Sequence, residues 1–221
     1  QCVSNEVGGE LVGNAVWQGV PLLDVLAMAG VQDGAEQVFT TSVDGFTAGF
    51  PVTALDGDRT ALLAYAMNGE PLLPEHGFPV RLVVAGLYGY VSATKWLSSI
   101  ELTTWADRDG FWIPRGWAKE GPIKLASRID VPGPGEAFDV GAVVIGGVAW
   151  LPSTGVGAVE VSVDGGDWTE CELAPVANDD TWVQWRLPLP DLAAGQHHAV
   201  VRARDADGTV QTDAVAPPAP D

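Results

Sequence analysis

The first third of the chain carries a helical pattern followed by an extended one. Residues 20–30 predict a short helix, because apolar side chains recur on one face, Pro21 suits the first turn and Gly30 suits the position after the end. The β-branched run from Val38 to Val43 predicts a strand, which the Asp44–Gly45 turn ends. We expect the helix to serve packing.

Short apolar runs continue the mixed pattern. Phe50–Val52 leads toward a second short helix at Ala54–Leu55, and Thr60–Met67 reads as a strand or a helix end. Val80–Val84 and residues 97–102 predict further strands, joined by a loop rich in Gly and Tyr. Helices and strands mixed without a regular βαβ rhythm predict an α+β fold.

The second half of the chain is different, because from Ser127 onward only strand patterns occur. Alternating runs separated by Gly, Pro and Asp turns predict an immunoglobulin-like sandwich of roughly a hundred residues. We therefore expect two domains, 1–125 and 126–221. The predicted strands of the second domain are 142–150, 156–164, 168–173, 181–187 and 197–205.

The segment between residues 105 and 124 is irregular and aromatic. It contains Trp105, Phe111, Trp112 and Trp117 among glycines and charged residues. A packed linker whose indoles cover a seam between domains is the favoured interpretation. A platform for a sugar or a quinone is the alternative.

Composition narrows the classes of partner. The 221 residues carry a formal net charge of -18, with only 11 Lys and Arg residues. Nucleic acid and anionic membranes require a basic surface, so both are unexpected as partners. No apolar run approaches the roughly 20 residues that span a bilayer, and no signal-peptide pattern is present.

Three of the basic or titratable residues fall close together in the sequence. His76 precedes the strand that begins near Arg81, and Lys95 lies in the segment leaving it. Together they would form a pocket for an anionic group. Taken singly, His76 reads as a hydrogen-bonded loop residue, Arg81 as a sheet-edge residue and Lys95 as a solvated side chain.

The two cysteines suggest different roles. Cys171 lies on a predicted strand between two glutamates and reads as an inert thiol. Cys2 opens a segment rich in Gly and Asn, where a soft thiolate could bind a transition metal. One pair of cysteines is not a disulfide framework, and the sequence leaves open whether the two meet.

Several motifs resemble one known family. The segments HGFPVRLVV (76–84), YG and KWL (95–97) are similar to the oxidoreductase molybdopterin-binding domain of the sulfite oxidase family, as is the C-x-x-N segment at Cys2 that precedes W-x-G-V-x-L at Trp17. The phrases VEVSVDGG (159–166) and VRARD (201–205) resemble the dimerisation domain that follows it. The resemblance implies the C-terminal portion of a mixed α+β molybdopterin-binding domain followed by an immunoglobulin-like domain.

This resemblance implies a cofactor and a site. Arg81 and Lys95 would lie at the pterin and its phosphate, and Cys2 would be the molybdenum ligand. The chemistry implied is oxygen-atom transfer on a small-molecule substrate, with an unidentified electron acceptor or donor and a possible homodimer. The cofactor-binding residues implied are Asn5, His76, Arg81, Tyr88 and Lys95.

Three positions depart from the pattern of sulfite-oxidising members. Glu6 and Val7 stand where those members carry arginines, Phe46 where they carry a tyrosine, and Ser153–Gly155 where they carry a third arginine. Each change removes a donor or a positive charge. With Cys2, Glu6 and Phe46 at the catalytic position, we expect a substrate other than sulfite.

Two other functions stay open at this stage. One is a non-catalytic binding or assembly module with a degenerate cofactor site. The other is a carbohydrate-binding sandwich suggested by the tryptophans, which would leave Cys2 and the HGFPVR segment unexplained. Since members of this family have a long segment before the ligand cysteine, we expect the chain to be the C-terminal portion of a longer protein, extracytoplasmic or membrane-associated.

Overall fold

The chain forms two compact units. The computed structural model describes residues 1–6, 8–57, 59–141, 143–215 and 217–219. The first unit consists mainly of Gln1–Asn5 and Glu10–Ile123, and the second mainly of Glu6–Gly9 and Lys124–Val215. The roles assigned above to domains 1–125 and 126–221 stay predictions.

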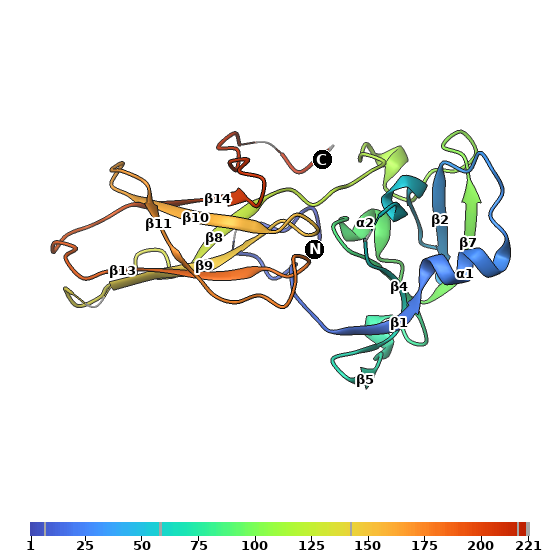
Figure 1. Cartoon of the computed structure of the whole chain (residues 1–221), viewed down its shortest axis with the longest axis horizontal. Coiled ribbons are helices and arrows are strands. Elements are labelled where there is room, and N and C mark those ends of the chain that lie inside the picture. Colours follow the sequence, from blue (N-terminus) through green and yellow to red (C-terminus); the bar gives the residue numbers. More distant parts are fainter. Residues whose placement is uncertain (7, 58, 142, 216, 220–221) are drawn as a thin grey trace. The chain divides into compact units, whose positions relative to one another are not determined.

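One sheet of the first unit is built around β4 (Ala61–Met67). β1 (Trp17–Pro21) pairs along one edge of β4, while β5 (Glu70–Pro71) and β6 (Arg81–Val84) pair along the other, all antiparallel (Figure 1). Asn68 and Gly69, with φ of 54° and 83°, make the tight turn from β4 to β5. Residues 60–67, which read as strand or helix, are therefore a strand.

A second sheet and one helix complete the core of this unit. β2 (Gln37–Ser42) lies between β3 (Thr47–Pro51) and β7 (Leu97–Thr103). The predicted helix is confirmed as α1 (Leu22–Ala29), with Gly30 at φ 78° donating its N–H to the Leu26 carbonyl at 3.1 Å. The buried core of the unit includes Leu22, Leu26, Val38, Phe50, Leu82 and Val91.

Three details of the first unit differ from the prediction. Pro21 stands at the N-cap of α1, ahead of the first turn. The second short helix is the 3-10 turn η1 (Val52–Leu55), which begins before Ala54. The loop predicted after β6 contains the short helix α2 (Gly89–Ser92), which is too brief to show a helical period. Two further 3-10 turns are η2 (Pro74–His76) and η3 (Ile113–Arg115).

The second unit is a two-layer sandwich, which confirms the immunoglobulin-like prediction. One sheet has the order β12 (Glu172–Leu173), β13 (Val183–Leu189), β9 (Val143–Trp150), β8 (Ala126–Val131). The other has the order β11 (Thr169–Glu170), β10 (Val156–Val163), β14 (Ala199–Asp205). Inward-facing side chains from both sheets form the core, among them Ile145, Val159, Val161, Trp185 and Ala203.

The strand predicted at 168–173 is wrong in one respect, because it is two strands. β11 pairs with β10 and β12 pairs with β13, so the chain changes sheets at Cys171. Cys171 is buried, and its N–H bonds to the Val159 carbonyl at 2.8 Å. Alternation continues through the crossing, which is why the sequence shows one unbroken run.

No helix among the described residues combines the length and apolar character needed to cross a bilayer.

We expect Gly19→Ala to destabilise the first unit. A Cβ at Gly19 would lie 2.5 Å from the Leu63 carbonyl oxygen and 2.8 Å from the Ala64 Cα. Because both are backbone atoms, the β1–β4 pairing must shift, at a cost of roughly 1–3 kcal/mol. The matched control is Gly13→Ala, where a Cβ would meet nothing within 4 Å. Thermal unfolding of the two variants measures the difference, and equal midpoints would contradict it.

Candidate functional site

A single 3-10 turn, η2, anchors the cationic side chains of the predicted anion pocket. The carbonyls of η2 accept hydrogen bonds from three side chains that follow it in the sequence. Trp96 Nε1 bonds to the first carbonyl at 2.8 Å, Lys95 Nζ to the second at 3.0 Å and Arg81 Nη1 to the third at 3.1 Å. The Pro74 carbonyl also accepts the Gly77 N–H at 3.1 Å, and the two carbonyls that follow it stand at the end of the turn, where a helical turn leaves its last carbonyls without partners of its own.

Gly77 allows the two cationic side chains to lie against this turn. It caps η2 in the left-handed region, with φ of 104°. A Cβ there would lie 2.9 Å from the Lys95 Cβ and 3.1 Å from the Arg81 Cβ. Glycine is therefore required twice, once by the backbone conformation and once by the space.

Arg81 is partly buried and incompletely paired. Its Nε is buried without a hydrogen-bond partner, and no carboxylate forms an ion pair with it among the residues described. Its guanidinium lies 5.0 Å from the centroid of the Trp17 ring. Burial lowers the pKa of Arg81 from its ordinary value. Since a buried charge without a counter-charge is costly, an anion bound here would be stabilising.

Lys95 is the second cation of the site. Its Nζ lies 4.4 Å from the centroid of the Trp96 ring and bonds to the carbonyl of Glu75. An ammonium group has three N–H donors, and the bond to Glu75 uses one of them.

Cys2 lies in a loop whose ends are tied together. Its N–H bonds to the Leu11 carbonyl at 2.9 Å, and the Leu11 N–H bonds to Asn5 Oδ1 at 2.7 Å. The thiol is free and partly buried, with Sγ 3.0 Å from Ser4 Oγ. The structure thus gives Asn5 a loop-closing bond, while its predicted cofactor contact stays a prediction.

Gln1 ties the Cys2 loop to the start of α2. Its carbonyl accepts the N–H of Gly89 at 2.9 Å. This bond places the residue before Cys2 beside the residue that follows Tyr88.

The remaining predicted residues fall in three places. His76 is partly buried and supports Arg81 through its carbonyl oxygen. Tyr88 is buried before α2, with its N–H bonded to the Gly121 carbonyl at 2.7 Å. Phe46 packs its ring 5.8 Å from that of Phe111.

Glu6 is exposed and is grouped with the second unit, and Val7 lies outside the described residues. Within the first unit, the structure therefore brings Arg81 and Lys95 together at the turn that contains His76.

The aromatic segment packs largely on itself. The Trp112 ring lies 5.1 Å from Phe111 and 6.1 Å from Trp117, and Trp117 lies 5.4 Å from Tyr90. Phe111 and Trp112 are each 38% exposed. These contacts lie within the first unit.

No group of three or more His, Cys, Asp or Glu side chains converges as a metal site within the described part of the chain.

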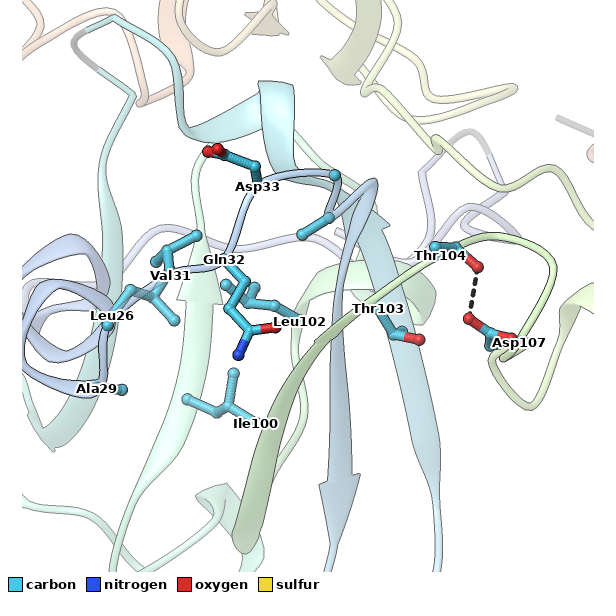
Figure 2. Close-up of a pocket in the computed structure, with 13 residues that line it drawn as sticks. Leu26, Ala29, Val31, Gln32, Asp33, Ile100, Leu102, Thr103, Thr104 and Asp107 are labelled. Atoms are coloured by element: carbon cyan, nitrogen blue, oxygen red, sulfur yellow. Dashed lines mark hydrogen bonds between the residues drawn. The ribbon is translucent and has the colours of Figure 1, made fainter.

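A separate hollow of about 490 Å³ lies between the end of α1, the loop at 30–35 and β7. Figure 2 shows the Gln32 side chain reaching toward Ile100 there. The charged side chains among its described lining residues are Asp33 and Asp107, with no cation. Its charge has the wrong sign for a phosphate-bearing ligand, which favours the η2 site for that role.

Sequence reasoning missed the contributions of Trp17, Gly77 and Trp96. All three lie inside the motifs quoted above, yet their roles depend on contacts that no local pattern shows. A tryptophan and an arginine on different strands give no sequence signal of stacking. The positive φ of Trp96, 50°, is likewise unusual for a residue of its size.

Comparison with known proteins places these features in context. The family model described as oxidoreductase molybdopterin binding domain matches residues 1–112. The chain is 35% identical over 243 residues to mitochondrial sulfite oxidase of Homo sapiens, covering 93% of this chain and 44% of that protein. It is 44% identical over 106 residues to the uncharacterised oxidoreductase YuiH of Bacillus subtilis, covering 48% of this chain and 52% of that one.

A solved structure is also similar. The sulfane dehydrogenase SoxCD from Paracoccus pantotrophus aligns with a TM-score of 0.75 and 26% identity, over 89% of this chain and 53% of that chain. The chain thus spans about half the length of the relatives that it matches.

The two thiols should differ sharply in reactivity. Burial raises the pKa of Cys171 to about 11, with Glu160 and Glu170 adding to the shift. At pH 8 such a thiol is ionised in roughly one molecule in a thousand, and only the thiolate reacts. In metal-free protein, we expect iodoacetamide to modify Cys2 at least tenfold faster. Peptide mass spectrometry measures both sites. Cys2→Ser is the control, and native labelling of Cys171 at an equal rate would contradict the expectation.

Proposed function

Because the chain belongs to the oxidoreductase molybdopterin-binding domain family, which includes the sulfite oxidases, we propose that its protein is a molybdenum-dependent oxidoreductase acting on a small molecule. The second unit, an immunoglobulin-like sandwich, fits the same proposal through the SoxCD similarity, which covers 89% of the chain. The family's cofactor is molybdopterin, so the molybdenum cofactor is the group to be tested against the site.

The proposal rests on the incomplete hydrogen bonding of the Arg81 guanidinium. A guanidinium with a buried, unpartnered Nε, beside a second cation anchored on the same turn, fits a phosphate-bearing ligand. Water alone would leave this charge poorly compensated, because the Nε atom is buried. The donor set therefore fits the pterin phosphate of the cofactor.

In this proposal each residue has a defined part. Arg81 and Lys95 hold the phosphate, with His76, Tyr88 and Asn5 shaping the surrounding wall. The Cys2 thiolate supplies the protein's ligand to molybdenum, and its closed loop fixes where the sulfur points. When bound, the cofactor supplies oxygen-atom transfer to or from the substrate with exchange of two electrons.

The substrate we propose is uncharged or cationic, and is not sulfite. Phe46 has no hydroxyl to offer an oxyanion, and its ring packs against Phe111. Glu6 is an exposed carboxylate four positions after Cys2 in the chain. A carboxylate near a bound anion is repulsive, so these residues favour a substrate without negative charge.

Partners follow from the chemistry. Oxygen-atom transfer needs a second protein or small molecule to take up or supply electrons, so we propose an external redox partner. The second unit resembles a dimerisation domain in the segments 159–166 and 201–205, which supports a homodimer as part of the same proposal.

The decisive experiment is metal and pterin analysis of the full-length protein and its Cys2→Ser variant. Wild type should hold close to one equivalent of molybdenum and one of pterin. The variant should keep its fold and its pterin, which the cations hold, and lose turnover because the thiolate is gone. Absence of both molybdenum and pterin from wild type would favour the binding or assembly module. An active Cys2→Ser enzyme would remove Cys2 from its assigned role.

The substrate proposal makes a kinetic prediction. Full-length protein should oxidise sulfite with a KM above roughly 1 mM, the top of the usual range, or not at all. Glu6→Arg combined with Phe46→Tyr should lower this KM, because the pair adds a cation and a hydroxyl donor. Glu10→Arg, which changes the net charge equally at another exposed position of the first loop, is the control. Efficient turnover at micromolar sulfite by the unmodified protein would refute the substrate proposal.

A further inference from the structure

Trp17 and Arg81 meet across the central strand of the first sheet. Arg81 begins β6 and is in register with Ala64 on β4, while Trp17 begins β1 on the opposite edge of β4. Trp17 is in register with Met67, three residues further along β4 than Ala64. The guanidinium carbon lies 5.0 Å from the centroid of the indole.

Two contacts fix the guanidinium of Arg81. The indole lies beneath it, and Nη1 donates to the His76 carbonyl at 3.1 Å. Arginine presents its donors as a flat fork, so a contact on the plane and one at the edge together set the direction of the remaining N–H groups. A cation over an indole is worth more where water is excluded, and the Nε of Arg81 is buried.

Lys95 is held in the same manner. Its ammonium lies 4.4 Å from the Trp96 ring centroid and donates to the Glu75 carbonyl at 3.0 Å. Each of the two cationic side chains thus lies over an indole ring and donates a hydrogen bond to a carbonyl of η2. Two cations built this way are preorganised, because neither must give up rotamer freedom when an anion arrives.

We propose that Trp17 is a positioning residue that holds the Arg81 guanidinium ready for the phosphate of the cofactor. The inference rests on the proposed function, in which Arg81 and Lys95 hold that phosphate. Trp17 acts through Arg81 and is not assigned a contact with the cofactor. Its contribution is orientation and stabilisation of the charged side chain, so loss of the indole should speed cofactor release more than it affects the fold.

The test uses full-length protein with Trp17→Phe and Trp17→Leu. Pterin is released by dilution and followed by its fluorescence, and thermal unfolding is recorded on the cofactor-free forms. We expect Trp17→Leu to release pterin roughly tenfold faster than wild type, and Trp17→Phe to fall between them, because phenylalanine keeps a weaker π face. A residue that only fills space would also give a graded effect, but its unfolding midpoints would fall in parallel with the faster release, whereas a positioning residue speeds release with little change in the midpoint.

The matched control is Trp168→Leu. In the second unit, the guanidinium carbon of Arg202 lies 4.0 Å from the centroid of the Trp168 ring. The variant therefore removes the same kind of contact outside the proposed site. Its pterin release should equal that of wild type. Should Trp17→Leu fail to fold, Trp17→Phe decides alone, with faster release supporting the proposal and unchanged release overturning it.

The outcomes separate the two proposals. Wild type that binds no pterin overturns the proposed function and this inference with it. Wild type that binds pterin, with both Trp17 variants releasing it at the wild-type rate, overturns the role of Trp17 and leaves the proposed function in place. Release that is equally fast in the phenylalanine and leucine variants, with equally lowered unfolding midpoints, also overturns it.

Discussion

The first unit is organised around a positive charge with which no described carboxylate forms an ion pair. Arg81 extends from the start of β6 with its Nε buried and unpartnered, and η2 offers it a single carbonyl. Burial lowers the pKa of Arg81, because removal of water disfavours the charged form of the guanidinium. The glycine cap of η2 and the indole on β1 both lie against the Arg81 side chain. In the proposed function they support a guanidinium whose counter-charge comes from a ligand.

The glycine that caps η2 is required for two reasons. Gly77 permits the side chains of Lys95 and Arg81 to pack against one turn, since a Cβ there would lie 2.9 Å and 3.1 Å from their Cβ atoms. The left-handed backbone of the η2 cap also requires glycine at this position.

Local patterns identified α1, β2 and most of the sandwich strands, since each carries its own period or turn signal, but they left residues 60–67 open between a strand and a helix end. They did not identify α2, which spans only Gly89–Ser92, nor the change of sheet at Cys171, where alternation continues unbroken. In the site, His76, Arg81 and Lys95 could be predicted because they lie in one stretch of sequence. The Trp17 contact could not, because it depends on how β1 and β6 are placed on the two edges of β4.

The way in which the Cys2 loop is closed affects which of its residues can change during evolution. Its two ends are joined by the bond between the Cys2 N–H and the Leu11 carbonyl, and by the bond from the Leu11 N–H to Asn5. These two bonds close the loop without using the side chains between Asn5 and Leu11. Evolution could therefore alter that short segment while Cys2, the ligand proposed for molybdenum, is inherited unchanged.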